Sequence, residues 1–212
     1  MFNKKKKFLI LFVFFVSFTI VSESNKAFSS KKEVLILEDS VKLLKEKKFT
    51  KAISSLKKLS NDNNIKAQFI LSQILYSGKI TTQDFEESYY WSNIAKLGGY
   101  KKSDKICKLL NDVLDEKTKM LIYDRVKKFL EKKALEYNKL AIVQSAKWYL
   151  TLSEEIDYEN AYKWYNVAVA IGIKTAIKKR DEIIEELSSE QIINAQKSSA
   201  EVFKILIKKE DK

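Results

Sequence analysis

The chain has 212 residues, a formal net charge of +12, one cysteine, and neither histidine nor proline. Without histidine it has no Ser-His-Asp or Cys-His catalytic set, no histidine metal ligand and no histidine pH switch, and Cys107 alone cannot form an internal disulfide. We therefore predict no catalytic, cofactor-binding or metal-binding residues. We interpret the excess of lysine mainly as a solvated, charged surface. The second interpretation is a basic patch that binds an anionic partner.

Residues 1–29 have the layout of an export signal. Four lysines, Lys4 to Lys7, precede an apolar run from Phe8 to Val21, and small residues suited to cleavage follow it. This run suits a signal-peptide core and is shorter than the roughly 18 to 20 residues that span a bilayer as a helix. We expect export to the periplasm. The alternative is an uncleaved anchor in the inner membrane over residues 8–21.

The remaining residues, 30–212, predict helices only. The few glycines fall where helical patterns stop, as C-terminal caps do. The predicted helices are 31–47, 50–60, 65–77, 85–97, 101–114, 116–135, 138–152, 158–171, 174–187 and 189–208. Their starts are marked by Asp84, Asp115, Asp157 and the capping-box pattern of residues 188–191.

One phrase of the sequence occurs twice. DFEESYYWSNIAKLGG (84–99) recurs as DYENAYKWYNVAVAIG (157–172), and a shift of 73 positions makes eight of the eighteen positions from 84 to 101 identical without a gap. The matched positions include Tyr76, Asp84, Trp91, Ala95 and Gly99 in the first copy and Tyr149, Asp157, Trp164, Ala168 and Gly172 in the second. The offset is close to twice a ~34-residue helix-turn-helix repeat, so we predict two copies of one fold unit.

The repeated phrase has the spacing of a packing stripe. Ser88, Trp91 and Ala95 lie at i, i+3 and i+7, so they share one face of a helix, and the second copy repeats this face. Small residues beside a large ring let a neighbouring helix approach closely. We therefore predict an all-α fold, a right-handed solenoid of stacked helix-turn-helix repeats.

These residues resemble the Sel-one-like repeat family, which is related to the tetratricopeptide repeats. The first copy, about 64–100, matches the family's small, Leu, Tyr, Gly, Asp, Trp, Ala and Gly positions at Ala67, Leu71, Tyr76, Gly78, Asp84, Trp91, Ala95 and Gly99. The second copy, about 137–176, keeps the pattern but has Leu150 or Thr151 in place of the loop glycine. Residues 35–60 are similar to a tetratricopeptide helix pair, and 177–208 to a C-terminal closing segment.

The resemblance implies a fold that binds other proteins and organises complexes, without a catalytic residue set. We expect an exported, non-enzymatic scaffold of the bacterial cell envelope with an unidentified protein partner and no nucleic acid, and with contact to anionic membrane or cell-wall polymer as a further possibility. A cell-wall glycan hydrolase or polymer-binding accessory is the alternative, since such hydrolysis needs paired carboxylates. Because the acids at 84–87 and 157–159 stand at predicted helix starts, capping is the favoured interpretation.

Two tyrosines are predicted as partner contacts. Trp91 and Trp164 lie on the packing stripe and are expected in the core. Tyr90 has Lys163 at its matched position, so it lies off the stripe, and Tyr165 also has no equivalent in the other copy. Since packing does not explain these two side chains, Tyr90 and Tyr165 are the candidates for contact with a partner.

Overall fold

The computed structural model of the chain describes residues 35–210, and the predicted export signal and anchor lie outside this range. The described residues form helices joined by short turns and contain no strand. None of the helices among them is both long and apolar enough to cross a membrane. The chain divides into two compact units, residues 1–55 and 56–212.

The first unit contains one helix, a turn and the start of a second helix. Residues 35–45 are helical, and helix α2 (Phe49–Asn61) begins in this unit and continues past its boundary. Between the two helices Lys47 has a φ of 57°, the left-handed conformation that commonly ends a helix. The buried Ser40 hydroxyl donates to the Ile36 carbonyl oxygen at 2.8 Å and lies 2.7 Å from the Ser55 hydroxyl. The contact between Ser40 and Ser55 joins the two helical segments.

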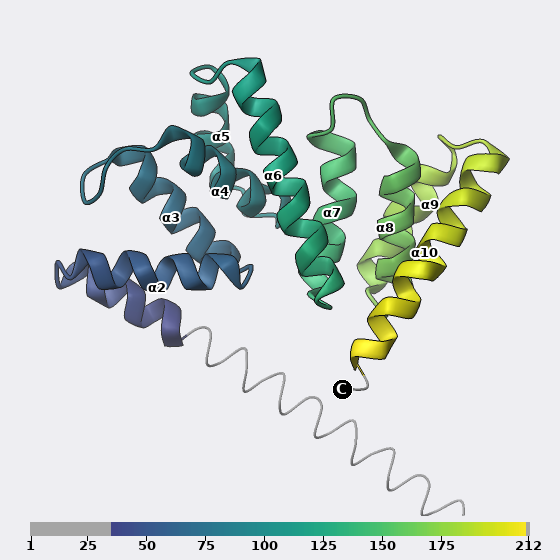
Figure 1. Cartoon of the computed structure of the whole chain (residues 1–212), viewed down its shortest axis with the longest axis horizontal. Helices are drawn as coiled ribbons and strands as arrows, with labels where there is room; N and C mark the ends of the chain where they lie inside the picture. Colours follow the sequence, from purple (N-terminus) through teal and green to yellow (C-terminus); the bar gives the residue numbers. More distant parts are fainter. Residues whose placement is uncertain (1–34, 211–212) are drawn as a thin grey trace, which may run out of the picture. The chain divides into compact units, whose positions relative to one another are not determined.

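The second unit is a succession of helix-turn-helix pairs (Figure 1). Its helices are α3 (Ile65–Ser77), α4 (Phe85–Leu97), α5 (Ser103–Asn111), α6 (Glu116–Leu135), α7 (Lys139–Thr151), α8 (Tyr158–Ala170), the 3-10 turn η1 (Lys174–Ala176), α9 (Ile177–Ile184) and α10 (Ser189–Glu210). Helix α4 packs on α3, α5 and α6, α6 packs on α7, and α8 packs on α7, α9 and α10. The predicted all-α solenoid of stacked repeats is therefore confirmed.

The predicted helix bounds agree closely with the structure except at 101–114, which is the shorter α5 (Ser103–Asn111), and at its counterpart 174–187. Helices 65–77, 85–97 and 116–135 have the predicted bounds. The helix predicted over 174–187 begins instead as a 3-10 turn and ends at Ile184. It lacks a side-chain cap at its start, and the Ile177 N–H donates to the Lys174 carbonyl, which is the i to i+3 hydrogen bond of a 3-10 turn.

The offset between the two copies corresponds to four helices, because α3–α6 are followed by α7–α10 in the same order. Asp115 caps α6 through the Thr118 N–H, and Ser188, which matches Asp115 at this offset, accepts from the Gln191 N–H before α10. The buried pairs Leu110/Ile183 and Ile122/Ala195 have the same offset. The repeating unit is therefore two helix pairs rather than one.

The first helix of each copy departs from this offset by a single position. Asn64 caps α3 by accepting from the Ala67 N–H, and its counterpart Asn138, one position beyond the offset, caps α7 by accepting from the Ala141 N–H. The Asp84 N–H donates to the Leu75 carbonyl and the Asp157 N–H to the Tyr149 carbonyl. Tyr149 is therefore the structural equivalent of Leu75, and the gap-free match of Tyr76 to Tyr149 is wrong in this helix. The reason is that the turn before α8 is shorter than the turn before α4 by a single residue.

Gly78 explains why the two turns differ. It ends α3 with a φ of 62°, and a Cβ at this position would lie 2.8 Å from the Cβ of Gln83. The Gln83 amide donates to the Tyr76 carbonyl at 2.8 Å, which holds Gln83 in place. In the second copy the cap residue is Leu152, with a φ of −127°, rather than Leu150 or Thr151. A residue other than glycine thus ends α7 with a different backbone conformation.

Replacing Gly78 by alanine is expected to lower the free energy of unfolding by about 2 kcal/mol, because the new Cβ meets both a left-handed backbone and the Gln83 side chain. Gly99 is the matched control: its φ is 89°, but no atom lies within 4 Å of a Cβ built there. Its replacement by alanine should cost about 1 kcal/mol, the backbone penalty alone. Urea denaturation measures both values, and equal losses would contradict a steric role for Gln83.

Candidate functional site

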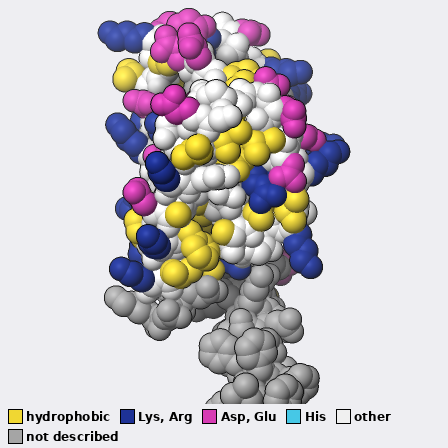
Figure 2. Space-filling model, turned by 90° about the vertical axis from the view of Figure 1, so that its right-hand side faces the viewer, with side chains coloured by type: hydrophobic (Ala, Val, Ile, Leu, Met, Phe, Trp, Pro, Cys, Tyr) yellow, Lys and Arg dark blue, Asp and Glu magenta, His cyan; other side chains and the backbone are white. Residues whose placement is uncertain are grey.

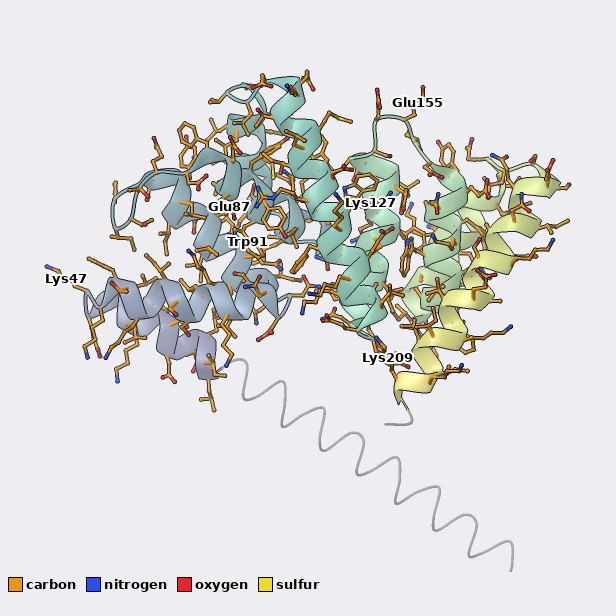
Figure 3. The ribbon with its side chains drawn as sticks, viewed as in Figure 1. Lys47, Glu87, Trp91, Lys127, Glu155 and Lys209 are labelled. Carbon is orange, nitrogen blue, oxygen red and sulfur yellow. The ribbon has the colours of Figure 1, made fainter. Side chains whose placement is uncertain are left out.

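The carboxylates at the starts of α4 and α8 serve mainly as caps. Asp84 accepts from the Glu87 N–H and Asp157 from the Asn160 N–H, each at 2.9 Å. Glu87, labelled in Figure 3, also forms an ion pair with Arg125 of α6. These groups are therefore occupied by helix capping and by the packing of α4 on α6.

Trp91 and Trp164 occupy matching places on α4 and α8. Only 6% of Trp91 and 3% of Trp164 is exposed, and Ala95 and Ala168, one turn further along, are fully buried. The Trp91 ring packs edge-on against Phe129 of α6, with ring centroids 5.8 Å apart. In both copies the small residue and the indole lie where α4 or α8 meets its neighbours.

The two tyrosines predicted to meet a partner are buried within the chain. Tyr90 is 8% exposed, and its ring lies beneath the Arg125 guanidinium at 4.6 Å; Tyr165 is 3% exposed. Burial raises the pKa of Tyr90, and it raises the pKa of Tyr165 to about 12. Both side chains are covered because α4 and α8 each have neighbours on several sides, so positions off the stripe are also buried.

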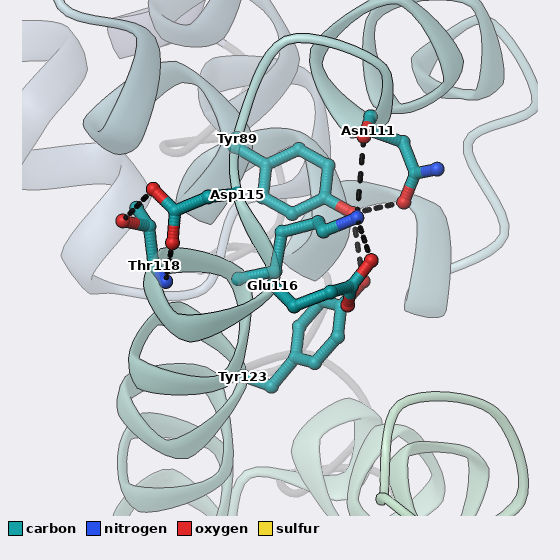
Figure 4. Close-up of polar contacts among 7 residues, drawn as sticks. Tyr89, Asn111, Asp115, Glu116, Thr118 and Tyr123 are labelled. Atoms are coloured by element: carbon teal, nitrogen blue, oxygen red, sulfur yellow. Dashed lines mark hydrogen bonds and ion pairs between the residues drawn. The ribbon is translucent and has the colours of Figure 1, made fainter.

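A polar cluster joins α4, α5 and α6 (Figure 4). The Tyr89 and Tyr123 hydroxyls lie 2.7 Å apart, and Tyr89 also donates to Asn111 Oδ1 at 3.3 Å. The buried ammonium of Lys119 donates to the Asn111 carbonyl and pairs with Glu116. Burial, followed by the hydrogen bond to Tyr123, raises the pKa of Tyr89. These groups satisfy one another, so the cluster ties three helices together.

Cys107 lies beside this cluster and is nearly buried. It is 5% exposed, its thiol donates to the Ser92 hydroxyl at 3.3 Å, and burial raises the pKa of the thiol. A protonated, covered thiol is a poor nucleophile. Cys107 thus acts as a small core residue.

A basic pocket of about 650 Å³ lies between α3 and α5. Lys101, Lys102, Lys105 and Lys108 surround an apolar floor made by Phe69 and Ile106. The one carboxylate among the lining residues, Asp104, pairs with Lys96 at 3.5 Å. This pocket has the charge that an anionic partner requires.

An acidic pocket of about 450 Å³ lies at the turn between α7 and α8. We define it by residues 153–159, which span that turn and the start of α8, by Lys127, Trp148 and Tyr149, and by Glu186, Leu187 and Gln191 near the turn between α9 and α10. Figure 3 shows Lys127 on α6 and Glu155 at the α7–α8 turn. Segments far apart in the sequence thus supply its walls.

The aromatic wall of the acidic pocket carries a cation of the chain itself. The Lys127 ammonium lies 5.3 Å from the ring centroid of Trp148 and 5.0 Å from that of Tyr149, within the range of cation–π attraction. The Trp148 N–H donates to the Tyr123 carbonyl at 3.0 Å, and the Tyr149 hydroxyl donates to Glu131 at 2.7 Å. Because their polar ends are bonded, both rings are held in fixed orientations.

Sequence reasoning missed this pocket. Its signal was the acidic run at 153–159, SEEIDYE, in a chain with an excess of lysine. That run was interpreted only through the cap residue Asp157 and the nearby Glu159. The contribution of Lys127 from α6 and of Glu186 from beyond α9 depends on tertiary packing and has no counterpart in local spacing.

The side of the molecule on which α10 lies is a mixed surface. Ile177 of α9 and Ile193, Ile205 and Ile207 of α10 are exposed large apolar residues. Figure 2 shows this side: its apolar side chains lie between basic and acidic ones. Among residues 35–210 no group of three or more Asp, Glu or Cys is arranged to hold a metal ion.

Comparisons with known proteins add little to this description. No protein-family model matches the sequence, and no curated protein matches it. Among solved structures, the crystal structure of c5321, a protective antigen present in uropathogenic Escherichia coli strains and displaying an SLR fold, aligns with 76% of this chain at 14% identity and a TM-score of 0.36. The chain spans 44% of the length of that protein. At this TM-score, the architecture rests on the packing of the helices described above.

Proposed function

We propose that this chain is an exported Sel-one-like repeat protein that acts as a non-enzymatic scaffold for other proteins at the bacterial cell envelope, in the periplasm. The observation that carries the proposal is that repeated residues of the stacked helix pairs form the core, while most residues that line the surface pockets differ between the copies. The repeated side chains, such as Trp91 and Trp164, are buried between helices, whereas the acidic pocket and the basic pocket lie at the surface. A rigid stack with varied surface pockets suits the binding of protein partners.

Site-specific photo-crosslinking in cells tests this function. A photoreactive side chain placed at Leu121, Ile156 or Ile193, which are 60%, 56% and 51% exposed, samples α6, the α7–α8 turn and α10. A scaffold is expected to give adducts of defined mass that depend on position, with none in samples kept in the dark. Absence of adducts at all three positions, or the same diffuse adducts at each, would count against a partner-binding role.

The alternative is a cell-wall glycan hydrolase, favoured by the carboxylates gathered in the acidic pocket. Incubating the purified protein with purified wall polymer separates the two functions. The scaffold releases no fragments. Release that is lost in Glu159→Gln, which changes a carboxylate of this pocket, would replace the proposed function with the hydrolase.

Export rests on the N-terminal sequence pattern. Determining the N-terminal residue of the protein isolated from the envelope fraction tests it, because cleavage leaves a chain that begins after residue 24 or 29. A chain that still begins at Met1 in the membrane fraction would favour the anchored form, and recovery from the cytoplasm alone would contradict export.

A further inference from the structure

We propose that the acidic pocket binds a lysine or arginine side chain of a partner protein, and that Lys127 occupies its aromatic wall when the partner is absent. This inference rests on the proposed role in protein binding and names the chemistry of the partner. It concerns a defined site, formed by the α7–α8 turn, the Lys127 side of α6 and the residues near the α9–α10 turn.

The charge of the pocket is opposite to that of the chain. Five carboxylates line it, from Glu154, Glu155, Asp157, Glu159 and Glu186, against the ammonium of Lys127, whereas the whole chain carries +12. Lys163 of α8 lies within electrostatic range of Asp157 and Glu159 but does not line the pocket. A concave surface lined mostly by one sign of charge concentrates its field and attracts ligands of the other sign. The expected ligand is therefore cationic.

Three of these carboxylates are available to a ligand. Glu154, Glu155 and Glu186 form no ion pair with any residue between 35 and 210, whereas Glu87, Glu116, Glu136 and Glu182 all have lysine or arginine partners. Because these three carboxylates are exposed, they lose little hydration in the free chain. Their interaction with a partner's cation is thus not offset by the loss of an internal pair.

The aromatic wall selects the form of the cation. Trp148 and Tyr149 are only 7% and 5% exposed, and the alkylammonium group of Lys127 lies over their rings, where a partner's cation would replace it. The described carboxylates are not grouped as metal ligands, so the pocket does not converge on a single small ion. A side chain with an apolar stem and a cationic end fits both the rings and the surrounding acids.

Lys127 is the competing group within the pocket. A partner's cation must share the rings with Lys127 or displace it, and the two positive charges repel one another. Removing the Lys127 charge should therefore strengthen binding. Lys128, exposed and adjacent on α6, provides a control with the same change in net charge.

Fluorescence anisotropy with a fluorescein-labelled hexalysine peptide, using the protein as isolated from cells, tests the inference. The variant Glu154→Gln/Glu155→Gln/Glu186→Gln is expected to bind the peptide about tenfold more weakly than the unaltered protein. The control Asp62→Asn/Asp112→Asn/Glu201→Gln removes the same number of exposed charges elsewhere and should change the Kd by less than about twofold. Thermal unfolding of both variants should match the unaltered protein, since all six side chains are exposed.

A second pair of variants tests the role assigned to Lys127. Lys127→Gln is expected to lower the Kd for hexalysine about fivefold, and Lys128→Gln by less than about twofold. Equal effects of these two lysine variants, or equal losses in the two triple variants, would overturn the inference, because either result describes general attraction to a charged surface. Binding of free spermidine as tight as that of hexalysine would overturn the choice of a peptide ligand.

Failure of this inference is distinguishable from failure of the proposed function. Position-dependent photo-adducts without specific hexalysine binding would remove the acidic pocket as the site and leave the scaffold role in place. Specific hexalysine binding without adducts at any position would support the cation site and count against the scaffold role.

Discussion

Replacing Trp91 or Trp164 by alanine is expected to lower the free energy of unfolding by about 3–5 kcal/mol, the cost typical of removing a large aromatic side chain from a core. Both indoles are almost fully buried beside fully buried alanines, so the stack cannot close the gap without moving a helix. Since each tryptophan serves its own copy of the repeat, the two losses should be similar. Chemical denaturation followed by circular dichroism measures them.

The matched control for this prediction is Leu121→Ala. Leu121 is a large apolar residue of α6, but 60% of it is exposed, so its removal should cost less than about 0.5 kcal/mol. A loss at Trp91 or Trp164 as small as that at Leu121 would mean that the indoles do not hold the stacked pairs together.

Replacing Gln144 by methionine is expected to lower the free energy of unfolding by about 2 kcal/mol, because it removes two buried hydrogen bonds. Gln144 Oε1 accepts from Asn63 Nδ2 at 2.7 Å, and Gln144 Nε2 donates to the Ile94 carbonyl at 2.9 Å. The side chain is fully buried on α7, while its two partners precede α3 and belong to α4. One amide therefore links the two copies of the repeat.

Two further variants make this second prediction specific. Gln73→Met changes an exposed glutamine of α3 in the same way and should cost less than about 0.5 kcal/mol. Asn63→Gly keeps the left-handed backbone at φ 65° and removes the amide that bonds Gln144. In the double variant with Gln144→Met, the loss in free energy of unfolding should differ from the sum of the two single losses by about 1 kcal/mol or more. Additive losses would argue against a direct interaction between Asn63 and Gln144.

The sequence alone determined the helices and their period, because the signals for both are local. Asn64, Asp84 and Asp115 cap α3, α4 and α6 through side chains that reach an N–H three residues away, so the start of each helix follows from a few adjacent residues. Gly99 and Gly172, matched at the repeat offset, both end their helices with positive φ. The two-pair period of the stack therefore followed from the repetition of such signals.

Only the tertiary structure decided which side chains are buried and which form a site. Tyr90 and Tyr165 lie off the repeated stripe, yet Arg125 covers one and both are enclosed, because α4 and α8 each contact several other helices. The acidic pocket likewise combines Lys127 of α6 with Glu186, which lies beyond α9 in the sequence. A helix cap depends on residues that are adjacent in the sequence. Burial and the electrostatic field in a pocket depend on residues that are adjacent in space, and the stacking of the helix pairs decides which residues those are.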